Sequence, residues 1–284
     1  MRQWKIGAAT VTKIVESEMT LGPDFVMPRA TAAAVKRIPW LKPPFVTDDG
    51  ELVMSFHALV IETPDRRIVV DTCVGNDKPR PAIPAWDNLQ GPFLRDLEAA
   101  GFKRESIDTV LCTHLHMDHV GWNTMLDGGE WTPTFPKARY LMAEKEFEHW
   151  RAQDEDSMHQ AVFEDSVRPV FDAGLVDLIP LEHEICAEVR LLPTLGHTPG
   201  HVSVLIQSKG EQALITGDFV HHPCQMAHVD WSTAVDFDPE ASIKTRRSVF
   251  EHFAETPTLI IGAHFAGPTA GRLRRDGDAY RLEV

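Results

Sequence analysis

The segment VLCTHLHMDHVGWN constrains this 284-residue chain more than any other, because an apolar strand runs directly into four residues of metal-ligand type. These residues are His114, His116, Asp118 and His119. Residues two apart in an extended chain point to the same side, so His114 and His116 can address one ion. After the chain turns, Asp118 and His119 can face a second ion. Imidazole and carboxylate suit zinc and its first-row neighbours without a thiolate.

A purely structural role explains this cluster poorly. One acid and three imidazoles at the end of an apolar strand would bear a large desolvation cost unless something paired with them. The density of ligand-type residues therefore predicts a metal centre.

Three later segments repeat the pattern of an apolar strand that ends in a ligand-type residue. They are EVRLLPTLGHTPGH with His197, QALITGD with Asp218, and TLIIGAH with His264. A glycine lies beside or close to each of these residues and lets the backbone turn sharply or approach closely. Together they supply the ligands that the first cluster lacks.

Hydrophobic periodicity predicts strands and helices along the whole chain. Strands are expected at 4–16, 55–63, 68–72, 107–113, 139–143, 176–181, 188–194, 201–208, 212–218 and 258–264, and helices at 91–102, at 239–254 and across 144–173, with a loop at 121–137. Two similar halves, each with β-hairpins followed by helix, predict two sheets face to face with helices outside, a four-layer αββα sandwich.

Length and composition favour one globular domain over residues 1–284, with 43% hydrophobic and 25% charged residues. The Pro-rich segment 20–50, with interleaved aromatic side chains, is interpreted as an irregular N-terminal arm that shapes a pocket. Its exposed aromatics would also support a homodimer. The net charge of -14 would repel phosphate backbones and anionic lipids, so neither nucleic acid nor a membrane is an expected partner.

The expected location is the cytoplasm. Lys5, Lys13 and Glu16 interrupt what would have to be the apolar region of a signal peptide, and no stretch has the length of a membrane span. The four cysteines are scattered, without a CxxC pair or the dense framework of small secreted domains.

The motifs HLHMDH and GHTPGH, the Asp of ITGD and the late GAH resemble signature regions of the metallo-β-lactamase superfamily, as does Asp71 in VVDT. The resemblance spans residues 53 to 264. It implies that His114, His116 and His197 bind one ion, that Asp118, His119 and His264 bind a second, and that Asp218 bridges them. It also implies that Asp71 orients a ligand through a hydrogen bond.

The same resemblance implies a dinuclear hydrolase in which a metal-bridging hydroxide attacks a carbonyl or phosphoryl centre. Asp118 or Asp218 would accept a proton as the intermediate breaks down. The implied cofactor is a pair of divalent metal ions, foremost Zn²⁺, with Mn, Fe, Co or Ni also compatible.

Departures from the patterns of individual subfamilies narrow the range of candidate substrates. Asp218 stands where some zinc β-lactamases carry a cysteine, and the 20 residues after His264 are too few for the helical extension of glyoxalase II relatives. The pattern is closest to the lactonase and methyl-parathion-hydrolase-like group, which implies a neutral, partly apolar small-molecule lactone or ester. Several lactonases carry a tyrosine three positions after the bridging Asp. Here that position is His221, whose imidazole can donate a hydrogen bond to an oxyanion.

Two other activities stay open on the same fold. One is a phosphotriesterase that cleaves organophosphates. The other is a mono-iron sulfur dioxygenase, which would require a single bound iron. Four side chains flank the ligands and could wall an apolar pocket for an acyl or aryl group, while ordinary core packing is expected for at least half of them. They are Met117, Trp122, Phe219 and Phe265.

Overall fold

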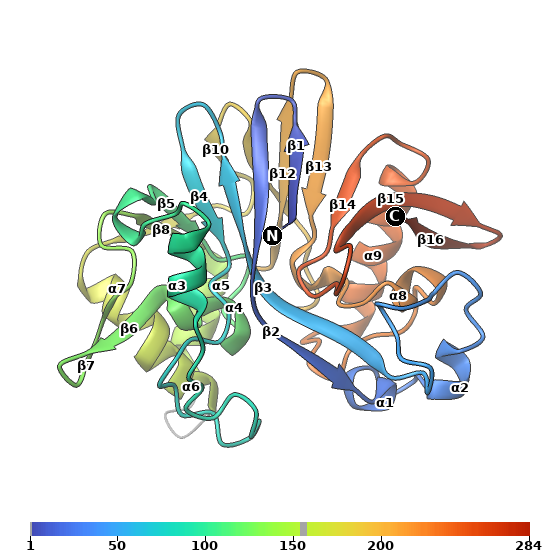
Figure 1. Ribbon diagram of the computed structural model, residues 1–284, viewed down its shortest axis with the longest axis horizontal. Helices are drawn as coiled ribbons and strands as arrows, with labels where there is room; N and C mark the ends of the chain where they lie inside the picture. Colours follow the sequence, from blue (N-terminus) through green and yellow to red (C-terminus); the bar gives the residue numbers. More distant parts are fainter. Residues whose placement is uncertain (1, 154–157) are drawn as a thin grey trace.

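The computed structural model describes residues 2–153 and 158–284, which form two seven-stranded sheets packed face to face with helices along their outer sides (Figure 1). The first sheet has the order β1-β2-β3-β4-β5-β8-β9 and the second the order β10-β11-β12-β13-β14-β15-β16. The predicted αββα sandwich is therefore confirmed. Among the described residues, no helix is both long and apolar enough to cross a membrane.

The strands of the first sheet are β1 (Arg2–Ile6), β2 (Ala9–Leu21), β3 (Leu52–Glu62), β4 (Arg67–Val70), β5 (Thr109–Leu111), β8 (Arg139–Ala143) and β9 (Val176–Ile179). Those of the second are β10 (Glu184–Cys186), β11 (Val189–Pro193), β12 (Val202–Ser208), β13 (Glu211–Ile215), β14 (Leu259–Ile261), β15 (Ala270–Asp276) and β16 (Ala279–Glu283). A separate hairpin consists of β6 (Thr124–Asp127) and β7 (Glu130–Pro133).

The α-helices are α1 (Pro23–Val26), α2 (Ala32–Val35), α3 (Phe93–Ala99), α4 (Met117–Val120), α5 (Glu144–Arg151), α6 (Met158–Val162), α7 (Arg168–Asp172), α8 (Cys224–Ala227) and α9 (Pro239–Phe253). Short 3₁₀ turns are η1 (Arg104–Ser106), η2 (Gly121–Asn123) and η4 (Gly217–Phe219), and η3 (Phe163–Val167) is a π-helical turn between α6 and α7.

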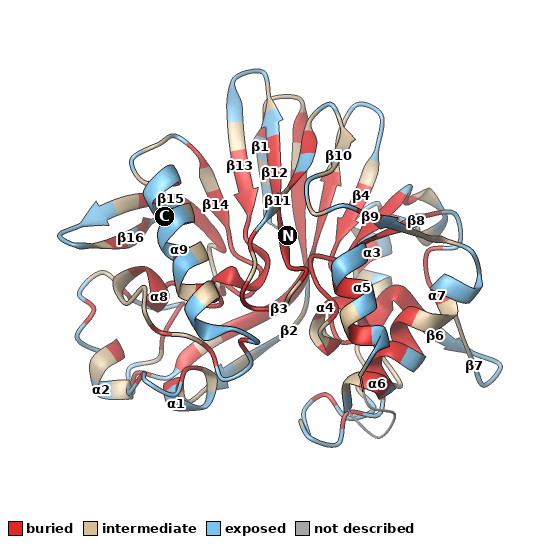
Figure 2. Cartoon of the chain, turned by 180° about the vertical axis from the view of Figure 1, so that it is seen from behind, coloured by how far each residue is buried: buried red, intermediate tan, exposed pale blue. Residues whose placement is uncertain are grey.

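The central strands are buried along most of their length (Figure 2). On β3, Leu59 and Ile61 join the cluster between the two sheets, whereas Ala58 and Val60 join the cluster beneath the helices. This follows from the two-residue repeat of a strand. Each fully buried Val, Leu or Ile side chain contributes roughly 1.5–3 kcal/mol. The strands can therefore hold loops rigidly at their ends.

The loops that carry the candidate ligands gather at one edge of the sandwich because the strands before them run in parallel. β4 pairs in parallel with β5, and β13 pairs in parallel with β14. The two sheets also meet at this edge, where the amide of Val202 donates to the carbonyl of Thr113 at 3.0 Å. Parallel pairing thus brings segments far apart in sequence to one place.

Most of the predicted elements are confirmed. The hairpin of β3 and β4, helix α3 and helix α9 lie where the periodicity placed them. The Asp238 side chain caps α9 by accepting from the amide of Ala241, and Gly101 follows α3 with a φ of +97°. The arm is largely irregular, but it contains the one-turn helices α1 and α2.

Two predicted elements are wrong. The single strand expected at 4–16 is the hairpin of β1 and β2, which turns at Gly7 and continues to Leu21, because β-branched residues lie on both sides of a two-residue turn. The loop expected at 121–137 contains the hairpin of β6 and β7. Its turn residues Gly128 and Gly129 both have positive φ, the geometry that a two-residue hairpin favours.

The close contact of α4 and η2 with the loop after β4 leads to a stability prediction. A Cβ on Gly121 would lie 1.8 Å from the carbonyl oxygen of Val74, so backbone would have to move. We expect Gly121→Ala to lower the free energy of unfolding by about 3 kcal/mol or more, measured by denaturant unfolding. Gly91→Ala is the control, because a Cβ there meets its nearest atom at 3.7 Å. Equal stability of the two variants would contradict this account.

Candidate metal centre

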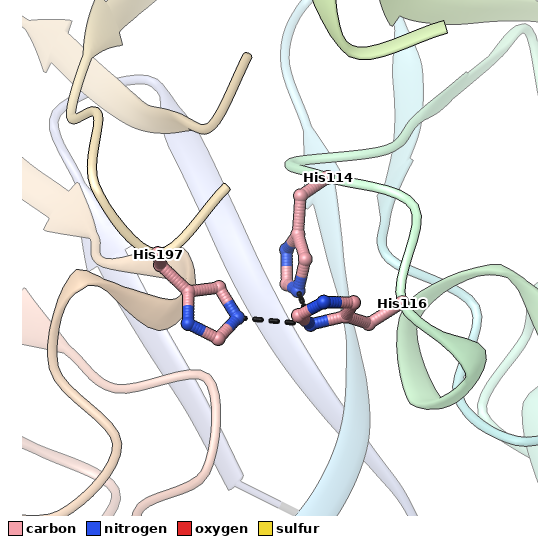
Figure 3. Close-up of side chains that lie close together, drawn as sticks. All are labelled: His114, His116 and His197. Atoms are coloured by element: carbon pink, nitrogen blue, oxygen red, sulfur yellow. Dashed lines mark hydrogen bonds between the residues drawn. The ribbon is translucent and has the colours of Figure 1, made fainter. Parts of the chain in front are cut away.

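Three histidines from two loops direct ring nitrogens at one another (Figure 3). The Nδ1 atom of His116 lies 3.1 Å from Nε2 of His114 and 2.9 Å from Nε2 of His197. His114 and His116 follow β5, and His197 lies between β11 and β12. Two facing imidazole nitrogens can share only one proton, so three that converge leave lone pairs directed at a common point. A cation matches that arrangement.

A second group lies beside the first. The Nε2 atoms of His119 and His264 are 3.1 Å apart, and Oδ2 of Asp118 lies 3.5 Å from Nε2 of His264. Helix α4 presents Asp118 and His119 from the end of the β5 loop, while His264 follows β14. The three ligand atoms lie within 4.8 Å of one another, close enough to hold one ion.

Asp218 lies between the two groups. Its Oδ2 atom is 3.6 Å from Nε2 of His197 and 3.2 Å from Nε2 of both His119 and His264. Its Oδ1 atom is buried without a hydrogen-bond partner among the described residues. An unpaired carboxylate oxygen is costly to bury, so this donor set fits a pair of cations.

His119, His197 and His264 each make an outward hydrogen-bond contact through the other ring nitrogen, Nδ1. Nδ1 of His119 lies 2.9 Å from Oδ2 of Asp71, and Nδ1 of His197 lies 2.9 Å from Oδ1 of Asp236. Nδ1 of His264 faces the carbonyl of Ser55 at 3.4 Å. Carboxylates and carbonyls accept, so the proton stays on Nδ1 and the lone pair of Nε2 points inward.

Asp71 also reaches His114 through a relay. Its carboxylate accepts from the amide and the hydroxyl of Thr113, each at 2.8 Å. Because that hydroxyl donates to Asp71, it can accept from Nδ1 of His114, which lies 3.1 Å away. One carboxylate thus orients ligand-type histidines in both groups.

Burial and neighbouring charges set the protonation of the centre. Burial lowers the pKa of His114 and His116 well below the ordinary value, and the nearby imidazoles lower it further. Burial alone would raise the pKa of Asp218, but His119 and His264 lower it well below its usual range. Burial also acts to lower the pKa of His119 and His264, but Asp218 and Asp118 outweigh it and raise both above the ordinary value. Metal binding requires neutral imidazoles, so ions that bind beside Asp218 would displace protons from these two rings.

His221 also contacts the carboxylate of Asp218. Its Nε2 atom is 3.1 Å from Oδ2 of Asp218, and its ring stacks over His264 with a centroid distance of 5.8 Å. The side chain is buried and lines the adjoining cavity. His197, Asp218 and His221 also form a group compact enough to hold an ion.

Asp236 and Glu146 support the centre, and neither was identified from sequence. Glu146 is buried on α5 and accepts from the amide of Leu115 at 3.1 Å and from that of Gly200 at 2.8 Å. It therefore ties the loop of His114 and His116 to the loop of His197. Both acids lie far along the chain from the loops that they hold, and no local motif marks either.

A cavity of about 680 Å³ opens above the centre. Its apolar side chains include Leu21, Phe25 and Val26 from the arm, Met54 and Phe56 from β3, and Ile83, Trp86, Trp150 and Phe237. Among the described residues that line it there is no lysine or arginine. Asp118 and Asp218 are the acidic side chains among its described lining residues.

Core packing is expected for at least half of the four side chains that flank the ligands, and it is found for three. Met117 lines the cavity, but Trp122, Phe219 and Phe265 are buried in the core. Trp122 stacks on Phe93 at 5.7 Å instead. The chain beside each ligand turns into the sandwich, so the wall comes from segments distant in sequence.

Comparison with known proteins agrees with this geometry. The family model of the metallo-beta-lactamase superfamily matches residues 57–264. The N-acyl homoserine lactonase of Bacillus cereus is 25% identical over 235 residues, which cover 77% of this chain and 84% of the relative.

Two solved structures have the same fold over nearly the whole chain. The dizinc quorum-quenching lactonase AidC superimposes with a TM-score of 0.83 at 20% identity, covering 99% of this chain and 96% of its own. The hydrolase AbOPH superimposes with a TM-score of 0.81 at 23% identity and the same coverage.

The chain belongs to the metallo-beta-lactamase superfamily. It is a hydrolase of that superfamily, distantly related to the N-acyl homoserine lactonases, and its His and Asp clusters are consistent with a binuclear metal site.

The hydrogen bond from His197 to Asp236 predicts an effect on metal affinity. We expect Asp236→Ala to weaken zinc binding about 10–100-fold, because the imidazole loses the acceptor that fixes its orientation. A competition titration against a chromophoric chelator measures the affinity. The control is Asp230→Ala, which removes only an exposed ion pair with Arg29. Wild-type affinity in the Asp236 variant would show that the contact does not orient the ligand.

Proposed function

We propose that this protein is a dinuclear metal-dependent hydrolase that opens a lactone or cleaves an ester in a neutral, partly apolar substrate. The observation that carries the proposal is the pair of ligand groups sharing Oδ2 of Asp218 beneath a cavity with an apolar wall. The proposed ligands are His114, His116 and His197 for one ion, Asp118, His119 and His264 for the other, and Asp218 between them. Zinc is the expected metal.

Two divalent ions, when bound, supply Lewis acidity and lower the pKa of a coordinated water. The protein supplies the remaining groups. Asp118 lines the cavity, so its carboxylate can accept a proton and pass it to the leaving oxygen. His221 lies on the cavity floor beside Asp218, where a ring N–H can donate to an oxyanion.

The cavity wall supports a neutral substrate. A carboxylate or phosphate on the substrate would meet no lysine or arginine among the described lining residues, only two aspartates directed at the metal centre. Phe25 and Phe237 lie at 70% and 64% exposure while lining the cavity, so they offer apolar surface to an alkyl or aryl group. The lactonase names of the relatives agree with a cyclic ester.

Metal content and substrate preference test the proposal together. Protein purified without added metal or chelator is expected to carry close to two zinc-like ions per chain by mass spectrometry. It is expected to hydrolyse members of a panel of lactones and aryl esters faster than a phosphotriester. A single iron without hydrolysis would contradict the proposal and favour a dioxygenase.

The variant Asp118→Asn tests the proposed role of Asp118 as a proton acceptor. We expect turnover to fall by about 10²–10⁴-fold with the fold intact, because the amide cannot take up the proton. Asp127→Asn changes an exposed aspartate on the β6–β7 hairpin and is the control. A wild-type rate in the Asp118 variant would rule out its proposed role.

A pair of variants isolates the role of His221. We expect His221→Phe to lower kcat about tenfold or more, because a ring of similar size cannot donate to the oxyanion. His221→Tyr adds one hydroxyl to that ring and is expected to recover part of the loss. Equal rates in the two variants would show that donation at this position does not contribute.

A further inference from the structure

The segment 77–89, after β4, is a compact loop that is anchored by cations. Its ends lie close together, since the amide of Asp77 donates to the carbonyl of Leu89 at 3.0 Å. Lys78 and Arg80 are both 0% exposed, although most of the other residues of the loop are exposed. Lysine and arginine are almost never fully buried unless they are paired. The two cations therefore need a partner inside the protein.

That partner is Asp165 in the π-helical turn η3. Two nitrogens of the Arg80 guanidinium donate to its carboxylate at 2.7 and 2.8 Å, and Nζ of Lys78 donates to its carbonyl oxygen at 2.8 Å. The centre of the Trp131 ring, on β7, lies 3.5 Å from the same Nζ. A bidentate contact between arginine and a carboxylate is strong and specific in its geometry. Asp165 thus holds both buried cations of the loop.

These three residues, here called the ionic anchor, join two segments of the cavity wall. The loop lines the cavity with Ile83 and Trp86. Helix α6, which continues into η3, lines it with Met158 and His159, and Figure 1 shows the loop beside this helix. The described residues that line the cavity include none of the ionic anchor. The anchor can therefore act on a bound molecule only through the wall that it holds.

We propose that Lys78, Arg80 and Asp165 are positioning residues, which hold the loop 77–89 against the segment of α6 and so set the width of the cavity. Stability alone would not call for charges, because well-packed apolar residues in place of a buried ion pair are often neutral or stabilising. A bidentate ion pair instead fixes one geometry, whereas apolar side chains can repack in several. The inference rests on the proposed hydrolase function only where a substrate is the probe.

The charge balance of the ionic anchor decides which variants test it. Two cations face one acid, so either cation can be removed while the carboxylate keeps a partner. Burial lowers the pKa of Lys78 to about 7, although Asp165 acts to raise it, so a neutral group at this position is tolerated near neutral pH. The variants are Lys78→Met, Arg80→Met and Arg80→Lys, the last of which keeps the charge but loses the paired donors.

Arg139→Met is the matched control. Arg139 makes a bidentate contact with Asp177 between β8 and β9, and neither residue lines the cavity. The control therefore removes the same kind of contact without touching the loop 77–89.

Hydrogen–deuterium exchange of the metal-loaded protein is the first readout, and it needs no substrate. We expect the amides of segment 77–89 to exchange about tenfold faster in Arg80→Met than in wild type, because loss of the anchor raises the population of the open loop. Lys78→Met and Arg80→Lys are expected to lie between the two. The hairpin of β12 and β13 is the internal reference, and its exchange is expected to stay unchanged, as is that of the loop in Arg139→Met.

The exchange rates decide the proposal even if one variant unfolds. Faster exchange of the reference hairpin in Arg80→Met would mean that this variant has lost its fold, and the other two variants then give the answer. Wild-type exchange of the loop in every variant that keeps its fold would overturn the positioning role.

Steady-state kinetics on phenyl acetate and phenyl decanoate are the second readout. We expect Arg80→Met to raise KM for the decanoate about tenfold and to leave kcat for both esters within about twofold of wild type, because the wall binds the chain without joining the reaction. Equal KM shifts for the two esters, or a lost kcat, would overturn the assignment of the loop as a wall. A wild-type protein that hydrolyses neither ester would contradict the proposed function, and the exchange rates would still decide whether the charges position the loop.

Discussion

The convergence of imidazole nitrogens on one carboxylate oxygen of Asp218 is the interaction on which the rest of the structure depends. Lone pairs and a carboxylate that face one another repel unless a cation lies between them, so the surroundings must hold them in place. Asp71, Asp236 and the carbonyl of Ser55 do so from outside, by accepting the outward N–H groups of the histidines. The sandwich provides the rigidity, because each ligand loop begins at the buried end of a strand.

Much of this could be predicted from the sequence, for a physical reason. A buried strand needs apolar residues along its length, and a metal site needs ligand-type residues at its end. Both features stand next to each other in the sequence before His114 and His116, and again before Asp218. The residues that support the ligands carry no such local mark. Asp236 meets His197 only after the chain has passed through β12, β13 and α8, and Glu146 looks like any acid in the first turn of a helix.

The residues of the cavity wall are also hard to predict from the sequence. Few neighbours of the ligands form it, because the chain that carries a ligand to the edge of the sheet turns back into the core. Trp122 therefore packs on Phe93, while Phe25 on α1 and Trp86 in the loop after β4 close the cavity from segments that sequence periodicity does not describe. Side-chain chemistry next to a motif thus predicts ligands better than it predicts the surface that a substrate meets.

The segment 233–237 connects the metal centre to that surface. Asp236 orients His197 and accepts from the amide of Thr233. Phe237 lines the cavity while its amide donates to the carbonyl of His197 at 3.0 Å. The amide of Ala234 donates to Val26 of the arm, also at 3.0 Å. These backbone contacts join the loop of a ligand-type histidine to the arm that lines the cavity. A movement of segment 233–237 would therefore displace both.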